Sequence, residues 1–427
     1  MSDSIDDLLQ NLDIIEIIEQ YAPLRKYGSE VVGLCPFHYD KKPTLKVDSF
    51  SQRFHCLQCK SEGNVVDFVA KATEQSIEKT IESLHAKVTE KTAKKVKFSQ
   101  ELNVDQMYEA HDLLAKLYHY LLTSTPKGKA ALKYLLNRGL KLETIKEFQI
   151  GYAPKEWEFT TGFLTNRNFD LPTMVDAGLL SMKKETNRIY DRFRGRIMFP
   201  IHDENGRVIA FGGRAMDNET NPKYLNSPDT PIFLKGETVY NIHRAKEHVT
   251  DNEPFTLYEG YMDVISAWQA GYRTGVATLG TSITIHQAKK IQSYNGVSII
   301  CYDGDKAGQD ATNKAIDYMT KVGSDVSVAP MPNDIDPDEY IKTYGAKQYG
   351  EYVLQRNMSV ASYHVDRLKS YYDLTQIDEF MQYATAALEV IHSVGDEKEK
   401  RKMALQIAQE TVISPDALHN HFIKIPL

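Results

Sequence analysis

Three short acidic clusters contain the residues of this chain best suited to chemistry. They run from Glu259 to Asp263, from Asp303 to Asp305 and from Asp336 to Asp338, and each follows a short apolar run typical of a β-strand. Carboxylates gathered at one edge of a sheet repel one another unless cations neutralise them. Mg²⁺ suits such a site because it takes a few hard oxygen ligands together with water and substrate phosphates. The clusters therefore predict metal-assisted phosphoryl or nucleotidyl transfer.

The sequence around the clusters alternates between strand and helix patterns. Elsewhere, helices are predicted at 5–22, over 104–148 and throughout the chain from about residue 339, and short strands at 31–34, 44–47 and 53–55. Around the clusters, strands are predicted at 255–258, 275–278, 297–302 and 326–329, and helices at 262–270, 284–293 and 306–321. Such alternation is typical of a mostly parallel sheet covered by helices. Ligands bind beyond the carboxyl ends of the strands in such a sheet, so this fold brings the three clusters to one edge. Gly308, in the first turn of a predicted helix, leaves room for a close approach there.

A second group of chemical residues lies near the N-terminus. Cys35 and His38 form one pair and Cys56 and Cys59 another, with two residues inside each pair and seventeen between the pairs. Three thiolates and one imidazole in this spacing predict one structural, tetrahedral Zn²⁺ site. His55 is the competing imidazole, but it lies outside the paired spacing.

The segment between the two ligand pairs is basic and aromatic. It contains four cations and two phenylalanines: Lys41, Lys42, Lys46, Arg53, Phe50 and Phe54. Cations for phosphates and rings for bases favour contact with single-stranded nucleic acid. The alternative is that the aromatic rings only pack a core too small to hold without zinc.

The middle of the chain concentrates arginine and glycine between residues 190 and 235. Arg214 follows a Gly-Gly turn and can approach a triphosphate bidentately. Lys223, Tyr224 and Asn226 add a cation, a stacking ring and an amide. The formal net charge of the whole chain is -7, so any surface for nucleic acid must be local.

Length and composition indicate a multidomain protein of the cell interior. The 427 residues, 42% of them hydrophobic, suggest about two to four domains. No apolar run is long enough to span a bilayer, and the start of the chain has no apolar signal region. The chain has four cysteines, three of them in the zinc pattern. Cys301 lies in an apolar run and is predicted to be a buried core thiol. A reducing, cytoplasmic location without membrane contact is therefore expected.

Residues 254–340 resemble a Toprim domain, on the strength of the acidic clusters and the strands that precede them. Primases, topoisomerases, recombination proteins and some nucleases share this domain. The resemblance implies that Glu259, Asp303 and Asp305 form the core catalytic and metal-binding site. Asp263, Asp336 and Asp338 match additional acidic positions of the primase branch, and would also bind Mg²⁺ or Mn²⁺.

The whole chain is similar to bacterial DnaG-type DNA primases. The resemblance rests on nine motifs: Tyr134 to Gly139 with Leu140, Phe148 to Pro154, Asp191 to Pro200, Phe211 to Arg214, Pro222 to Pro228, Glu259 to Asp263, Leu279 to Thr281, Asp303 to Gly308 and Asp336 to Asp338. It implies an α/β multidomain fold with an N-terminal zinc ribbon, a mixed α+β basic subdomain, a Rossmann-like parallel Toprim sheet and a C-terminal helical subdomain. It also implies that Arg138, Arg214, Lys223 and Lys235 hold template or incoming nucleotide.

The implied domains are a zinc ribbon at 1–85, a linker at 86–103, the basic subdomain at 104–252, the Toprim domain at 253–340 and the helical subdomain at 341–427. The linker is lysine-rich, and its alternative reading is a solvated continuation of the preceding helix. The family departs from this chain in two respects. It usually has an aromatic residue and glycines where Leu57-Gln58 and Lys60 to Glu62 stand. This difference leaves zinc binding intact but weakens the expectation of template contacts at that edge. The family also normally carries a further helicase-binding domain, so we expect either a truncated polypeptide or a different helicase coupling.

The expected function is template-directed synthesis of short RNA primers on single-stranded DNA by a monomer. The expected cofactors are one Zn²⁺ and about two to three Mg²⁺ or Mn²⁺ ions. Expected partners are ribonucleoside triphosphates, the RNA–DNA hybrid product, a replicative helicase and a single-stranded DNA-binding protein. Two alternatives remain at this point: a Toprim nuclease or topoisomerase, and a non-enzymatic DNA-binding module with a decayed Toprim domain. The intact acids argue against the second.

Overall fold

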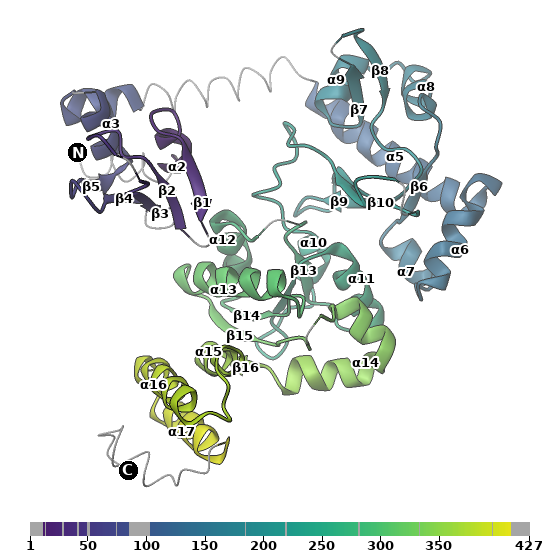
Figure 1. Ribbon diagram of the computed structural model, residues 1–427. Helices are drawn as coiled ribbons and strands as arrows, with labels where there is room; N and C mark the ends of the chain where they lie inside the picture. The colour runs from purple at the N-terminus through teal and green to yellow at the C-terminus, as the bar shows by residue number, and fades with distance from the viewer. Residues whose placement is uncertain are drawn as a thin grey trace. The chain divides into compact units, whose positions relative to one another are not determined.

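The computed structural model describes residues 12, 14–27, 30–40, 42–48, 52–73, 75–84, 103–183, 185–217, 220–280, 282–332, 334–394 and 396–410. The chain divides into two compact units, Met1–Asn103 and Val104–Leu427 (Figure 1). The predicted linker at 86–103 lies outside the described residues except for Asn103. The same holds for the start of the helix predicted at 5–22.

The N-terminal unit is built on one antiparallel sheet with its strands in chain order. The strands are β1 (Leu24–Tyr27), β2 (Glu30–Gly33), β3 (Leu45–Asp48), β4 (Arg53–Cys56) and β5 (Glu62–Asn64). The helices are α2 (Ile14–Ile18), α3 (Val65–Thr73) and residues 77–84. Phe54 is buried, and its ring centroid lies 5.0 Å from that of Phe68. Phe54 therefore packs the core, as the alternative interpretation of the aromatic rings expected.

The C-terminal unit begins with helices, as the pattern over 104–148 predicted. They are α5 (Val104–Ser124), the 3-10 turn η1 (Pro126–Gly128), α6 (Lys129–Asn137) and α7 (Leu142–Glu147). A four-stranded antiparallel sheet of order β11-β10-β9-β6 follows. Its strands are β6 (Gly151–Ala153), β9 (Arg196–His202), β10 (Val208–Ala215) and β11 (Tyr224–Asn226). The hairpin of β7 (Leu180–Lys183) and β8 (Arg188–Asp191), with helices α8 (Phe159–Thr165) and α9 (Leu171–Asp176), completes this part.

The second sheet of this unit has the order β13-β12-β14-β15-β16. Its first four strands, β12 (Phe255–Tyr258), β13 (Gly275–Ala277), β14 (Val297–Ile300) and β15 (Asp325–Val328), pair in parallel. The mostly parallel sheet predicted from the sequence is therefore confirmed. The fifth strand, β16 (Met358–Ser359), is antiparallel to β15. The expectation of helix throughout the chain after residue 339 is wrong here, because a two-residue strand leaves no periodic signal.

Helices cover both faces of this sheet. Leu257 and Ile300 pack on one face in a core shared with Ile316, whereas Tyr258 and Cys301 pack on the other in a core shared with Val264. Figure 1 shows α12 (Ile285–Tyr294) and α13 (Lys306–Lys321) on one side, and α11 (Tyr261–Ala270) and α14 (Pro337–Gln355) on the other. The short α10 (Ile242–Ala245) precedes β12. The prediction that Cys301 is a buried thiol is confirmed.

One hydrophobic core joins the basic part of the chain to the parallel sheet. Its buried members include Phe148 from the first helices, Phe199 from β9, and Tyr258 and Val264 from the parallel sheet and its helix. Because these residues belong to a single cluster, the antiparallel sheet and the parallel sheet share their packing.

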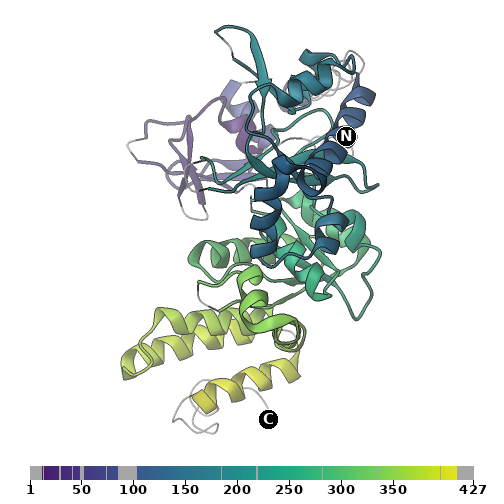
Figure 2. The same cartoon turned by 90° about the vertical axis from the view of Figure 1, so that its right-hand side faces the viewer.

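The C-terminal helices form a separate small cluster. They are α15 (Val360–Leu368), the 3-10 turn η2 (Lys369–Tyr371), α16 (Ile377–Ser393) and α17 (Glu397–Glu410). Tyr383, Ile391 and Met403 fill their core. Figures 1 and 2 both show α16 and α17 side by side. None of the helices in the described ranges has the length and apolarity needed to cross a bilayer.

Candidate active site and zinc centre

The carboxyl ends of the parallel strands open into a cleft of about 710 Å³. Five of the predicted acids line it: Glu259, Asp263, Asp303, Asp336 and Asp338. Five predicted nucleotide-binding or template-binding residues line it as well: Arg138, Arg214, Lys223, Tyr224 and Asn226. Asp305 and Lys235 are the two predicted site residues that do not line the cleft. The structure thus brings acids and cations from distant parts of the chain into the lining of one cleft.

The predicted acids that line the cleft are called its acidic wall. Glu259 and Asp303 are in contact within this wall. The backbone N–H of Asp303 donates to Oε1 of Glu259 at 3.1 Å. Gly308 lies against both residues, because a Cβ added to it would come within 2.2 Å of the Asp303 carbonyl oxygen and 2.7 Å of Glu259 Oε1. The predicted need for a small residue at Gly308 is therefore confirmed.

The acids of the cleft are hard to keep ionised without a cation. Burial raises the pKa of Asp303 to about 7, and the charges of Glu259, Asp336 and Asp305 act in the same direction. Burial and nearby carboxylates likewise raise the pKa of Asp263 well above its ordinary value. The Oδ1 atom of Asp303 is buried and has no hydrogen-bond partner in the part of the chain that the structure describes. A buried, unpartnered carboxylate oxygen among other acids fits a divalent cation.

Asp305 and Asp336 each begin a helix. Oδ1 of Asp305 accepts from the N–H of Gly308 at 2.7 Å, and Oδ1 of Asp336 accepts from the N–H of Glu339 at 2.6 Å. These are helix N-cap bonds, which fix the carboxylates while leaving their other oxygens unused by the cap. Asp305 is exposed beside the cleft. Its charge still contributes to the raised pKa values of Glu259 and Asp303.

Asp338 differs from the other acids because it meets a predicted nucleotide-binding residue. Its Oδ2 lies 2.9 Å from Nη2 of Arg138 and also pairs with Lys342. Its Oδ1 accepts a hydrogen bond from Ser266. Its backbone N–H donates to Oδ1 of the buried Asp263 at 3.2 Å.

Arg214, Lys223, Tyr224 and Asn226 form what we call the basic wall of the cleft. Arg214, on β10, is its central residue. The side chain is buried, its Nε donates to the hydroxyl of Tyr134 at 3.1 Å, and its Nη1 donates to the hydroxyl of Tyr224. Lys223 is exposed beside it, and Nδ2 of Asn226 donates to the Leu279 carbonyl at 3.1 Å. Lys235 stands apart from this group. Its backbone N–H donates to Oδ1 of Asp229 at 2.8 Å, and its carbonyl accepts from Gln287.

Sequence reasoning did not single out Tyr134 and Lys342. Lys342 lines the cleft one helical turn after Asp338, so the i, i+4 spacing of opposite charges was an available signal. Tyr134 lay inside a motif already recognised, but its bond to Arg214 joins residues 80 positions apart. No local pattern indicates such a contact.

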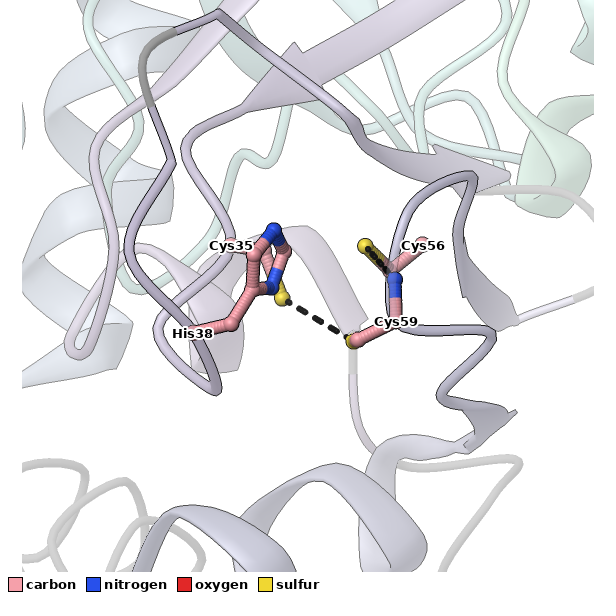
Figure 3. A group of neighbouring side chains, drawn as sticks. All are labelled: Cys35, His38, Cys56 and Cys59. Atoms are coloured by element: carbon pink, nitrogen blue, oxygen red, sulfur yellow. Dashed lines mark hydrogen bonds between the residues drawn. The ribbon is translucent and has the colours of Figure 1, made fainter.

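The four predicted zinc ligands come together in the N-terminal unit. Figure 3 shows Cys35, His38, Cys56 and Cys59 converging from two turns. Each offers one ligand atom, and these atoms all lie within 4.8 Å of one another. Both ring nitrogens of His38 are buried without a hydrogen-bond partner among the described residues. Such an arrangement fits one tetrahedral Zn²⁺. The competing His55 instead contacts Glu62 at 3.2 Å.

The surroundings of the zinc ligands hold them in place. Asp40 accepts hydrogen bonds from the N–H of Cys35 and the hydroxyl of Thr44, at 3.1 and 2.7 Å, and its Oδ1 lies 3.8 Å from Nε2 of His38. Burial raises the pKa of Cys35 to about 12. Burial acts in the same direction on Cys56, but hydrogen bonds, above all with Thr44, outweigh it and lower its pKa to about 6. Partners of this kind orient metal ligands and tune their basicity. Lys41 and Phe50 lie outside the described residues.

Known protein families match the chain in three stretches. The CHC2 zinc finger matches residues 1–100, the N-terminal domain of the DNA primase catalytic core matches residues 117–246, and a Toprim-like domain matches residues 256–341. The DNA primase of Halalkalibacterium halodurans is 35% identical over 425 residues, which cover 99% of this chain and 71% of that protein. The chain belongs to the DnaG-type bacterial DNA primases.

Further relatives and solved structures agree with this family. The DNA primase of Geobacillus stearothermophilus is 38% identical over 98% of this chain and 70% of its own length. The Aquifex aeolicus primase, solved with its zinc-binding and RNA polymerase domains, is 27% identical, with a TM-score of 0.58 and 99% of both chains covered. A DnaG primase catalytic domain solved with bound single-stranded DNA is 33% identical over 72% of this chain and 96% of its own, with a TM-score of 0.59.

Membership of the DnaG-type primases establishes the activity of the chain. It is a DNA primase, a DNA-directed RNA polymerase that makes RNA primers in DNA replication. The predicted family, enzyme class and fold class are confirmed. The Cys₃His set belongs to a CHC2 zinc finger, and the Toprim domain indicates a divalent cation. The rival interpretations as a nuclease, a topoisomerase or a non-enzymatic module gain no support from these relatives.

Proposed function

We propose that the cleft is the polymerisation site and that Glu259, Asp303 and Asp305 hold its divalent cations. Asp263, in the first turn of α11, and Asp336, the N-cap residue of α14, support the same cluster. The observation that carries this proposal is that six carboxylates and four cations line one cleft. The acids suit about two to three Mg²⁺ or Mn²⁺ ions, and the cations suit a triphosphate.

When bound, the divalent cations would lower the pKa of the attacking ribose 3′-hydroxyl and neutralise charge on the departing pyrophosphate. The protein supplies position and charge around them. Arg214, held between two tyrosine hydroxyls, presents a fixed guanidinium to the phosphates. Lys223 adds a second, exposed cation. Tyr224 offers a ring for stacking on a base, and Lys235 extends the basic region beyond the cleft. Positioning and electrostatics of this kind supply most of the acceleration in nucleotidyl transfer.

We propose that the template strand leaves the cleft along a basic and aromatic strip. Nη2 of Arg192 donates to the carbonyl of the cleft residue Asn226 at 3.1 Å. Two residues further along the chain, the guanidinium of Arg194 lies 3.9 Å from the centroid of the Trp157 ring and 5.4 Å from that of the Tyr190 ring. Trp157 is 57% exposed. Exposed rings beside arginines suit the bases and phosphates of a single strand, and a related DnaG domain was solved with single-stranded DNA bound.

Trp157→Ala is expected to weaken binding of single-stranded DNA roughly 5- to 50-fold, because one base would lose its stacking partner. Fluorescence anisotropy with a labelled oligonucleotide measures the change. The matched control is Tyr371→Ala, since Tyr371 is 69% exposed and also has an arginine near its ring. Equal loss of affinity in both variants would contradict a specific strip at Trp157.

The zinc ribbon, the linker and the partner proteins have proposed roles in holding the template and in replication. We propose that the zinc ribbon (1–85) holds or reads the template, tethered by the linker (86–103) and acting on its own catalytic part or on a neighbour's. The catalytic part divides into 104–252, 253–340 and 341–427. Ribonucleoside triphosphates are the substrates and an RNA–DNA hybrid is the product. A replicative helicase and a single-stranded DNA-binding protein would be partners of the monomer in the bacterial cytoplasm.

A primer assay tests the proposal. Single-stranded DNA, the four ribonucleotides and Mg²⁺ are expected to yield short RNA products that disappear when the nucleotides or the metal are withheld. In the same experiment, labelled DNA incubated without nucleotides should stay intact. Metal-dependent cutting of that DNA would favour a Toprim nuclease instead.

A further inference from the structure

Asp338 is the one cleft acid whose side chain is already satisfied by cations. Its carboxylate is 4% exposed and pairs through Oδ2 with both Arg138 and Lys342. Its Oδ1 accepts from the Ser266 hydroxyl. Asp303 is the opposite case, because its Oδ1 has no partner among the described residues. The two acids therefore differ in what they can still bind.

The partners of Asp338 come from different parts of the C-terminal unit. Arg138 caps the end of α6, whereas Lys342 and Asp338 belong to α14. The contact joins residues 200 positions apart. Arg138 and Lys342 both line the cleft, and both also line a second, smaller cavity of about 150 Å³. Asp338 thus holds two cations in the wall of the cleft.

Tyr134 connects Arg138, a partner of Asp338, to Arg214 in the basic wall. Nε of Arg214 donates to the Tyr134 hydroxyl at 3.1 Å, and the backbone N–H of Arg138 donates to the Tyr134 carbonyl at 3.0 Å. Burial raises the pKa of Tyr134, but the charges of Arg214 and Arg138 outweigh burial and leave the pKa lowered. Burial lowers the pKa of Arg138, but the charges of Asp338 and Tyr134 outweigh burial and leave the pKa raised. A continuous chain of contacts therefore runs from Asp338 through Arg138 and Tyr134 to Arg214.

We infer that Asp338 is a positioning residue, which holds Arg138 and Lys342 against the anionic nucleotide and does not ligate the divalent cations. This inference rests on the proposed polymerisation site. A dication at Asp338 would have to approach two cations at close range and displace their bonds, which is unfavourable in a buried setting. The nucleotide, with its negative phosphates, gains from the same two cations.

The test compares Asp338→Asn with Asp336→Asn, which removes the same charge two residues away. Mn²⁺ binding to the protein without nucleotide is measured by electron paramagnetic resonance, and the apparent KM for ribonucleotides by the primer assay. Asp338→Asn is expected to keep the wild-type number and affinity of Mn²⁺ sites and to raise KM about 10-fold or more, since a charge-assisted bond network is lost. Asp336→Asn is expected to weaken Mn²⁺ binding. Loss of a Mn²⁺ site in Asp338→Asn, at unchanged thermal stability, would overturn the inference.

A second arm uses Arg138→Met and the double variant Arg138→Met/Asp338→Asn. If Asp338 acts through Arg138, the KM effects of the two changes are not additive. Fully additive effects would overturn the inference even if Asp338→Asn proved poorly folded. Failure of the proposed site itself looks different, because Asp303→Asn would then bind Mn²⁺ as the wild type does.

Discussion

Asp303→Asn is expected to reduce kcat for primer synthesis at least about 100-fold, because the change removes a charge from the centre of the acidic wall. The substitution keeps the volume of the side chain and removes a half-buried carboxylate whose pKa is already raised to about 7. The folded protein should therefore lose little stability without metal and should lose affinity for Mn²⁺. Primer yield and Mn²⁺ binding, measured on the same preparation, separate these effects.

The control for Asp303→Asn is Asp325→Asn. Asp325 is exposed at the amino end of β15, whereas the catalytic acids follow the carboxyl ends of the parallel strands. It carries the same charge within the same sheet, so primer synthesis should be unchanged. Wild-type kcat in Asp303→Asn, or equal losses in both variants, would remove Asp303 from the proposed site.

Cys56→Ser is expected to release about one Zn²⁺ per chain and to unfold the N-terminal unit, since a structural zinc site contributes much of the folding energy of a small module. Templated initiation should be lost, while Mn²⁺ binding at the acidic cleft should persist. Metal analysis by mass spectrometry gives the zinc content, and the primer assay gives initiation.

Cys301→Ala is the matched control for the zinc site. It removes a thiol that is fully buried in the parallel-sheet domain and lies 3.6 Å from the hydroxyl of Tyr349. This variant should lose stability in the C-terminal unit yet retain its zinc. Retention of zinc by Cys56→Ser would show that the Cys₃His set is not the binding site. Unimpaired initiation after zinc loss would remove the zinc module from the mechanism.

The sequence predicted the parallel sheet well, because its strands are short apolar runs and their connections are helical. It also predicted that Glu259, Asp303 and Asp336 would meet, since carboxyl ends of parallel strands share one edge. The strands β1, β5 and β16 were not predicted. Each is two to four residues long, and pairing with a neighbour, which no local pattern reveals, determines such strands.

The predictions for the cleft itself were less complete. Arg138 and Asp338 were assigned to nucleotide and metal, and the sequence did not predict that they bind one another across 200 positions. Lys235 was expected near the nucleotide, but it lies outside the cleft lining. The resemblance to primases marked these residues as important, whereas their contacts depend on how α6 and α14 pack. Spacing along the chain carries no such information.

The shared core beneath the two sheets has a consequence for how variation in this enzyme is interpreted. Phe199 and Tyr258 belong to one hydrophobic cluster, although Phe199 lies on β9 of the antiparallel sheet and Tyr258 on β12 of the parallel sheet. The same packing therefore stabilises both the acidic wall and the basic wall. A core substitution that destabilises one wall is expected to destabilise the other. A cavity made under β9 would therefore weaken the binding of phosphates and also displace the catalytic acids. Loss of activity in this chain consequently need not trace to any group that touches the nucleotide.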